Sequence, residues 1–168
     1  GAVATLGRAI AALQVVRNFA LSGVGVVPLP ERDTIGSAAD FLLQREDIDT
    51  VIVFGIVGDR IDGSLRTNSA SVDPATLLDA AFGRDPEGRP YGGGRSEKGG
   101  FQIPLGMLAE CTDPAALWRL AEGVVRSRLT RIVPGWPTPR RPRIDGIRWG
   151  ARDVARPGLG RPTLRAPI

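Results

Sequence analysis

The chain has 168 residues with an ordinary apolar share of 42% and few aromatic residues, so it suits one domain with an appendage and an aliphatic interior. It has one cysteine, Cys111, and no histidine. This excludes an internal disulfide, most zinc and transition-metal sites, and nucleophiles that need an imidazole base. The longest apolar run, Val51 to Val57, is far short of the roughly 20 residues that cross a bilayer as a helix. We therefore expect a cytoplasmic protein with no membrane partner and a buried, reduced cysteine.

The formal charge of +4 is unevenly distributed along the chain. Residues 1–133 carry 13 Arg and one Lys against 16 acidic residues, a net −2, whereas residues 134–168 carry eight Arg against two Asp, a net +6. The positive charge is thus concentrated in the C-terminal part, and only locally placed arginines can support anion binding elsewhere. The first residue is glycine and not methionine, which is compatible with a fragment whose natural start lies upstream.

Three elements are predicted before the most apolar part of the chain. The helical spacing of Leu6 and Ile10, with alanines between them, predicts a helix that we interpret as a connecting helix over residues 1–21. Residues 23–30 combine β-branched side chains with closing prolines, which predicts a short strand that ends abruptly. Residues 33–45 begin with a capping side chain and continue with a helical pattern.

The centre of the chain predicts a β-hairpin. Residues 50–57 are almost entirely Val, Ile and Phe, which is typical of a strand covered on both faces. A turn at Gly58 and Asp59 follows, and residues 60–67 then alternate. The alternation places one set of residues toward the core and a polar set on the opposite face, namely Ile61, Gly63 and Leu65 against Asp62, Ser64 and Arg66.

Two helix starts are marked by an aspartate followed by a proline, at Asp73 and Asp113. The first helix is expected to end near Phe82. The second is expected to run to Leu129, with a packed side made of Leu117, Leu120, Val124 and Arg128. Between these helices we expect a glycine-rich loop and a short strand over residues 101–105.

Strands that alternate with helices, together with one hairpin, predict an α/β or α+β fold with a mixed β-sheet and flanking helices. Residues 134–168 are rich in Pro, Gly and Arg and show no period, so they cannot bury enough surface to offset chain entropy. We expect three parts: the connecting helix, a ligand-binding domain over residues 22–133, and an irregular tail over residues 134–168.

The strongest indication of a binding site is the glycine-rich segment from Tyr91 to Gly100. Consecutive glycines let backbone N–H groups turn toward an anion, while Arg95 and Lys98 supply positive charge. A flexible connection is the alternative interpretation of this segment. The acidic residues show no spacing that indicates a metal site, so we predict no catalytic or metal-ligating residue in this chain.

A second indication comes from the predicted strand over residues 60–67. Its alternation places the Ser64 hydroxyl and the Arg66 guanidinium on one face, where the two groups could hold a phosphate together. The alternative is a polar strand face exposed to solvent.

In this order, the segments resemble a known family. Ser-Leu-Arg on a strand is followed by Ser-Val-Asp-Pro before a helix ending in Ala-Phe-Gly, then by Gly-Gly-Gly, Gly-Gly-Phe and Gln-Ile-Pro-Leu-Gly. This pattern is similar to the C-terminal DHH-associated domain of DHH-family phosphoesterases, especially the RecJ-like and oligoribonuclease/pAp-phosphatase proteins. The resemblance covers roughly residues 20–110.

The resemblance implies a division of labour. In this family an N-terminal DHH domain holds two manganese ions with Asp and His residues, and the C-terminal domain binds a nucleotide or single-stranded nucleic acid. The substrate contacts implied here are Ser64, Arg66, Gly92, Gly93 and Gly94. The family loop continues with histidine where this chain has Arg95, which keeps anion binding but removes proton transfer. We expect no cofactor in this chain, which would be inactive without its catalytic domain.

Two other functions are consistent with the sequence. The chain could be a module that packs against a neighbouring domain or forms a homodimer without binding a ligand. Alternatively, the tail over residues 134–168 could act as an arginine-rich arm that binds nucleic acid.

Overall fold

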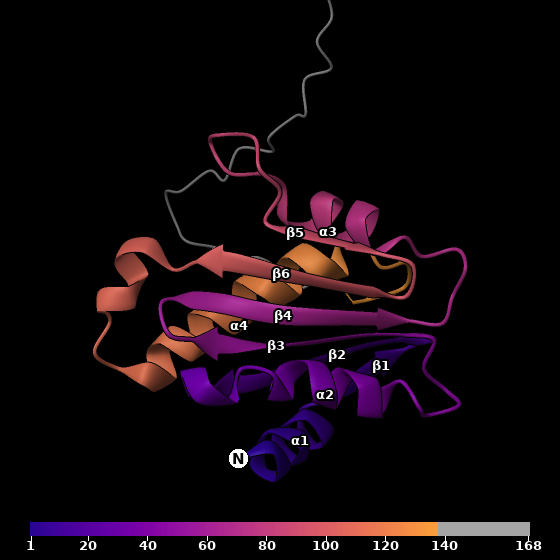
Figure 1. Ribbon diagram of the computed structural model, residues 1–168, viewed down its shortest axis with the longest axis horizontal. Coiled ribbons are helices and arrows are strands. Elements are labelled where there is room, and N and C mark those ends of the chain that lie inside the picture. Colours follow the sequence, from indigo (N-terminus) through magenta and orange to yellow (C-terminus); the bar gives the residue numbers. More distant parts are fainter. Residues whose placement is uncertain (138–168) are drawn as a thin grey trace, which may run out of the picture.

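In the computed structural model, residues 1–137 are described, and within them six strands form one mixed sheet with helices on both faces (Figure 1). The sheet order is β1-β2-β3-β4-β6-β5. The strands are β1 (Gln14–Val16), β2 (Phe19–Val26), β3 (Thr50–Val57), β4 (Arg60–Thr67), β5 (Gly92–Arg95) and β6 (Lys98–Pro104). The helices are α1 (Ala2–Ala11), α2 (Thr34–Leu42), α3 (Pro74–Phe82) and α4 (Pro114–Thr130), with 3-10 turns η1 (Leu29–Glu31) and η2 (Gly106–Glu110). The predicted α/β fold with a mixed sheet and flanking helices is confirmed.

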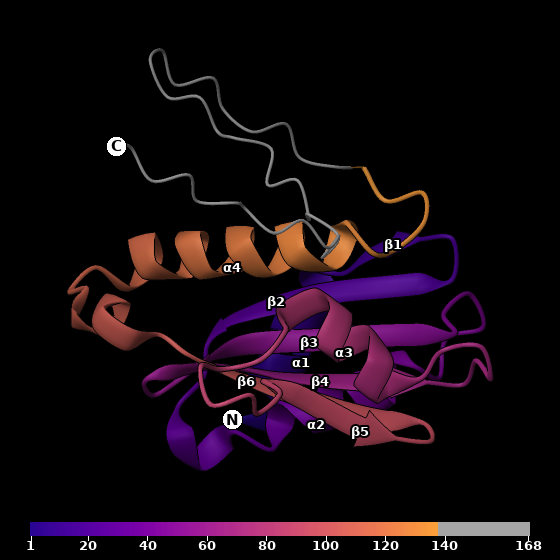
Figure 2. The ribbon, with the colours of Figure 1, turned by 90° about the horizontal axis from the view of Figure 1, so that it is seen from above.

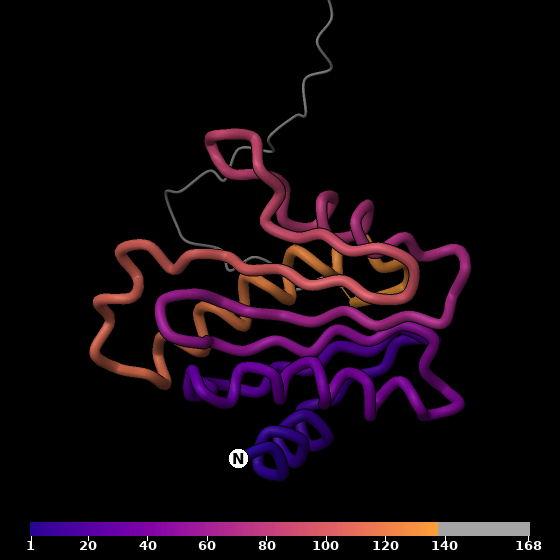
Figure 3. Tube along the Cα trace, in the orientation of Figure 1, coloured from indigo at the N-terminus to yellow at the C-terminus, as the bar shows by residue number. Residues whose placement is uncertain are grey.

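The central strand is β3, and every one of its residues is buried. It runs parallel to β2, to which η1 and α2 connect it, and antiparallel to β4, to which Gly58 and Asp59 connect it directly. The trace in Figure 3 shows the β3–β4 hairpin lying beside the β5–β6 hairpin, because β4 pairs with β6. The predicted bounds of β3 and β4 are confirmed.

The two faces of the sheet have separate cores. Figure 2 shows α4 on one side of the sheet and α2 on the other. The first core lies under α3 and α4 and is built around Ile52, Phe54, Leu65, Leu78, Phe101, Val125 and Leu129. The second core lies under α1 and α2 and is built around Ala9, Val24, Ile35, Ala38, Leu42, Val51 and Val53. Alternate residues of β3 therefore serve opposite cores, as expected for a strand covered on both faces.

The two helix starts marked by Asp-Pro are confirmed. The Asp73 carboxylate accepts a hydrogen bond from the Thr76 backbone N–H at 3.0 Å, and Pro74 occupies the first helical position. Asp113 accepts from the N–H groups of Ala115 and Ala116 at 3.1 and 3.2 Å. These carboxylates satisfy backbone donors that have no partner within the helix.

The predicted helix over residues 1–21 is wrong beyond Ala11. Residues 14–16 form β1, and β2 begins at Phe19, earlier than the strand predicted over residues 23–30. The Leu6 and Ile10 spacing holds for α1, but pairing of β2 with both β1 and β3 decides the conformation of the following residues. Such pairing is a tertiary interaction that local periodicity does not reveal.

The predicted glycine-rich loop is instead a β-hairpin, because β5 and β6 pair from Gly92–Phe101 to Arg95–Lys98. The predicted packed side of α4 is right for Leu117, which packs against the first core, and wrong for Leu120 and Val124. Ala121, Val125 and Leu129 are buried, whereas Leu120 and Val124 are about half exposed. Because Ala121, Val125 and Leu129 face the sheet, Leu120 and Val124 face outward.

Two expectations about the whole chain bear on its environment. Cys111 is exposed rather than buried, because it lies in the connection between η2 and α4. In the described part of the chain no helix is long and apolar enough to cross a membrane.

The tail predicted over residues 134–168 lies outside the described residues from 138 onward. Before that point, Trp136 packs edge-on against Phe19 with ring centroids 6.2 Å apart.

Glycines on adjacent strands allow the packing of the sheet to be tested. A side chain at Gly63 would collide with the ring of Phe101, whereas a side chain at Gly93 meets no atom within 4 Å in residues 1–137. We expect Gly63→Ala to lower the free energy of unfolding by about 1–3 kcal/mol, the usual cost of overpacking. Gly93→Ala should leave it unchanged or raise it slightly. Urea denaturation of both variants measures the difference, and equal losses would contradict this packing.

Candidate functional site

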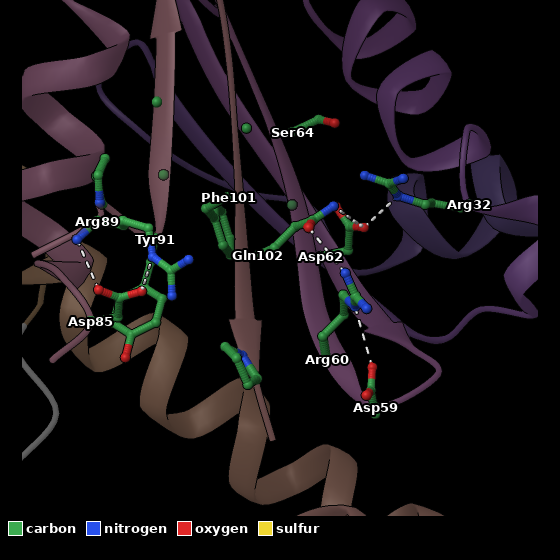
Figure 4. A pocket seen from close by; sticks show the side chains of 16 residues that line it. Arg32, Asp59, Arg60, Asp62, Ser64, Asp85, Arg89, Tyr91, Phe101 and Gln102 are labelled. Atoms are coloured by element: carbon green, nitrogen blue, oxygen red, sulfur yellow. Dashed lines mark hydrogen bonds and ion pairs between the residues drawn. The ribbon is translucent and has the colours of Figure 1, made fainter. Parts of the chain in front are cut away.

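A cavity of about 750 Å³ opens over the β4, β6 and β5 part of the sheet (Figure 4). Helix α2 contacts β3 and β4 on this face, so the outer strands remain uncovered by it. The lining residues are Arg32, Asp59, Arg60, Asp62, Gly63, Ser64, Asp85, Arg89, Pro90, Tyr91, Gly92, Gly93, Gly100, Phe101, Gln102 and Pro104.

The floor of the cavity is almost bare backbone. Ser64, Gly100 and Gly93 are cross-strand partners on β4, β6 and β5, so they lie in a row and face the same way. Within the described residues, no atom lies within 4 Å of the position that a Cβ of Gly93 would occupy. A ligand can therefore approach the peptide groups of this row closely, with one hydroxyl, that of Ser64, at its inner end.

The other glycines of this hairpin have structural roles. A Cβ on Gly92 would lie 2.9 Å from Cβ of Leu78, and one on Gly99 would lie 2.8 Å from Cβ of Pro74. A Cβ on Gly94 would collide with the backbone of Lys98. These positions need glycine because α3 and the hairpin itself leave no room for a side chain. Gly93 has no such reason, which distinguishes it from its neighbours.

One wall of the cavity is a chain of polar contacts that starts from Arg32. Its Nε donates to Oδ2 of Asp62 at 2.6 Å, and the same oxygen accepts from Nε2 of Gln102 at 3.4 Å. Arg60 donates from Nη1 to Oε1 of Gln102 at 3.2 Å and from Nε to Asp59 at 3.3 Å. Asp62 is buried, whereas the Arg32 side chain is half exposed. The buried carboxylate thus holds Arg32 through Nε, so that its two terminal nitrogens can serve a ligand.

The opposite wall is formed by the connection between α3 and β5. Asp85 accepts hydrogen bonds from the backbone N–H of Arg89 at 2.8 Å and from its Nε at 2.9 Å. The backbone bond from Arg89, followed by that residue's side chain, lowers the pKa of Asp85 against the opposing effect of burial. Tyr91 follows this turn and is half-buried. Figure 4 shows Asp85, Arg89 and Tyr91 facing Asp62 and Gln102 across the cavity.

The lining is electrically balanced, with three arginines and three aspartates among its residues. Each of the three guanidiniums is held through Nε by an aspartate of the same cavity. Guanidinium groups bind phosphate and carboxylate with paired, planar hydrogen bonds. The balance favours a ligand of low charge that also carries hydrogen-bond donors for the carboxylates.

The structure brings some of the predicted site residues into this cavity and leaves others outside. Ser64, Gly92 and Gly93 line it, whereas Gly94 and Arg95 lie toward the exposed hairpin turn and are not among its lining residues. Arg66 also lies outside it. Its side chain is only 14% exposed, and its Nε donates to Oδ1 of Asp40 on α2 at 2.6 Å.

Several lining residues were not predicted as site residues from the sequence, namely Arg32, Arg60, Asp62, Asp85, Arg89, Tyr91 and Gln102. For Asp62 a signal was present, because the alternation of β4 placed it on the same face as Ser64. Arg32 and Arg89 lie in irregular connections, which have no period to indicate direction. In residues 1–137 no group of three or more His, Cys, Asp or Glu could hold a metal ion.

Comparison of the amino-acid sequence with known proteins finds a relative from an archaeon. No protein-family model matches the chain. An uncharacterized protein of Methanocaldococcus jannaschii is 37% identical over 129 residues, which cover 76% of this chain. The chain spans 25% of the length of that relative.

Solved structures give weaker similarities. An exopolyphosphatase-related protein from Bacteroides fragilis superposes with a TM-score of 0.45 and 15% identity, covering 74% of this chain and 34% of the other. The C-Ala domain of Aquifex aeolicus alanyl-tRNA synthetase gives 0.41 and 21%, covering 67% and 96%. A pGpG-specific phosphodiesterase from Vibrio cholerae gives 0.37 and 14%, covering 75% and 38%. Similarities at this level transfer no activity or substrate to this chain.

The turn from Asp85 to Arg89 should respond to acid. Because the pKa of Asp85 is lowered in the folded protein, its contribution to stability is present above the unfolded value of about 3.9 and is lost as the pH falls through the folded value. We expect carboxyl NMR titration to give a pKa below the ordinary range. Arg89→Ala should preserve most of this lowering, since the backbone donor remains. A pKa at or above the ordinary value would contradict the geometry of this wall.

Proposed function

We propose that this chain contains the substrate-binding module of a DHH-type phosphoesterase. The module grips the phosphate of a nucleotide or of a short single-stranded nucleic acid, and a catalytic domain absent from this chain hydrolyses the ester. The observation that carries the proposal is the bare row of Gly93 and Gly100 lying between guanidinium groups on two walls of one cavity. The resemblance of the strand and glycine motifs to the DHH-associated domain points to the same role.

In this proposal a phosphate lies over the glycine row. Its oxygens accept hydrogen bonds from the Ser64 hydroxyl and from the terminal nitrogens of Arg32, with Arg60 and Arg89 nearby at the two walls. Charge-assisted bonds of this kind are worth about 1.5–3 kcal/mol each. Side chains at the floor positions would hold the phosphate away from these donors.

The carboxylates of the cavity narrow the ligand class. Asp59, Asp62 and Asp85 would repel a chain of several phosphates, but they can accept hydrogen bonds from sugar hydroxyls or base amino groups. Tyr91 offers an aromatic ring on which a base could stack. A nucleoside monophosphate or one phosphate of a short oligonucleotide fits this balance better than a polyphosphate does.

Hydrolysis is assigned to another part of the protein. In this proposal the two manganese ions implied by the resemblance are held by the catalytic domain, where the family places its Asp and His ligands; this chain has no histidine. The relative from Methanocaldococcus jannaschii, of which this chain spans 25%, supports an arrangement in which such a module is one part of a longer protein.

A side chain on the floor of the cavity should weaken phosphate binding without unfolding the protein. We expect Gly93→Val to weaken binding of a nucleoside monophosphate and of a 5′-phosphorylated trinucleotide by at least about tenfold, a loss of about 1.4 kcal/mol. Isothermal titration calorimetry of the full chain measures this. The control is Gly7→Val on α1, where a Cβ likewise meets no atom within 4 Å in the described structure. Unchanged affinity in Gly93→Val would remove the glycine row from the site.

The arginines of the cavity can be separated from Arg66. Arg32→Ala should weaken binding of the same ligands by about 1–3 kcal/mol, because it removes charge-assisted hydrogen bonds. Arg66→Ala should chiefly lower the free energy of unfolding, because its guanidinium is held by Asp40 outside the cavity. Calorimetric titration of both variants measures the ligand affinity, and urea denaturation measures the free energy of unfolding. The opposite pattern, with affinity lost only in Arg66→Ala, would move the site to the strand motif.

A further inference from the structure

The outer side of α4 carries a shallow groove that the proposed function does not use. It is lined by Arg119, Leu120, Gly123, Val124, Ser127, Arg128 and Arg131, and we call it the α4 groove. Its volume is about 420 Å³. Because α4 and α2 lie on opposite sides of the sheet, this groove is remote from the cavity over β4 and β6 (Figure 2).

The centre of the α4 groove is apolar and exposed. Leu120 and Val124 lie one helical turn apart and are 49% and 51% exposed. The side of α4 that packs on the sheet is occupied by Ala121, Val125 and Leu129, so Leu120 and Val124 contribute little to the core. Two apolar side chains of α4 thus face outward.

Gly123 lies between these two residues, and within residues 1–137 no packing contact requires a glycine there. A Cβ at this position would meet no atom within 4 Å in residues 1–137. Glycine destabilises a helix interior relative to alanine. A glycine on an exposed helix face instead allows another backbone to approach closely, which is the second feature expected of a contact surface.

The edges of the α4 groove carry a single sign of charge. Its ionisable lining residues are Arg119, Arg128 and Arg131, with no acidic residue among them. On the flank of the helix, Arg126 is already paired with Glu122 at 3.0 Å. An apolar pair bordered by guanidinium groups is complementary to an apolar stripe bordered by carboxylates.

We propose that the α4 groove binds an acidic amphipathic helix of a partner protein. Apolar side chains of the partner would cover Leu120 and Val124, its backbone would pass near Gly123, and its Asp or Glu residues would face Arg119, Arg128 and Arg131. The other occupants fit less well. A second copy docked symmetrically would oppose arginine to arginine, and residues 138–168 of this chain carry eight Arg against two Asp. The groove has no aromatic ring on which a nucleic-acid base could stack. It offers a lipid surface only two half-exposed apolar side chains for insertion.

The test uses the full chain and a fluorescent helical peptide with leucines at helical spacing and glutamates beside them, followed by fluorescence anisotropy. A peptide of the same composition in scrambled order is the reference. We expect saturable binding of the amphipathic peptide, weakened at least about tenfold by Val124→Glu and by Arg128→Glu. Met107→Glu is the matched control, because Met107 is also exposed, at 85%, but lies in η2. It should bind like the unchanged protein.

Charge reversal provides a check that does not depend on the apolar substitution. The double variant R119E/R128E should lose the glutamate peptide and gain a peptide with lysines in the same places. Thermal melts should show the fold unchanged, because both side chains are at the surface. Three results would overturn the proposal. They are equal binding of the scrambled peptide, no binding of the lysine peptide by R119E/R128E, and α4 substitutions that change self-association rather than peptide binding. A further contradicting result would be that the α4 substitutions remove binding of an oligonucleotide or an anionic vesicle, while the glutamate peptide does not bind the unchanged protein.

Discussion

The packing of the Phe101 ring against the backbone of Gly63 is the contact on which the candidate site depends. It draws β6 onto β4 on the side of α3 and α4, where Leu65, Leu78 and Phe82 complete the core. Since strand residues alternate between faces, burying Phe101 on one side places Gly100 and Gln102 on the other. The cavity is therefore the reverse side of a well-packed core, and its floor is held by the sheet rather than by a mobile loop.

The asymmetric covering of the sheet explains why the cavity is open. Helix α2 lies over β3 and β4, while α3 covers β5 and β6 from the opposite side. The outer strands thus have one packed face and one face open to the cavity, where Gly93 and Gly100 carry no side chain. Arg32, at the end of η1, and Arg89, in the connection before β5, bring guanidinium groups to the two edges of this face. Aspartates of the same cavity hold both side chains, which reduces the ordering that a ligand would have to impose.

The cavity and the α4 groove differ in charge and in position. The cavity has balanced charge and a polar, backbone-rich floor, whereas the outer side of α4 is apolar at its centre and positive at its edges. They lie on opposite sides of the sheet, so a ligand in one leaves the other accessible (Figure 2).

The amino-acid sequence by itself determined the elements whose signals are local. For these elements, the residues that carry the signal lie within or next to the element itself. They are the apolar run of β3, the turn at Gly58, the alternation of β4 and the capping aspartates at 73 and 113. Only the tertiary structure decided that residues 14–16 and 19–21 pair as strands, that the glycine-rich segment is a hairpin, and that α4 packs through Ala121 and Val125. It also decided which arginines meet at the cavity, selecting Arg32 and Arg89 and directing Arg66 to Asp40. The physical reason is that strand pairing, helix rotation and side-chain direction depend on partners distant in the chain, whose positions no local pattern encodes.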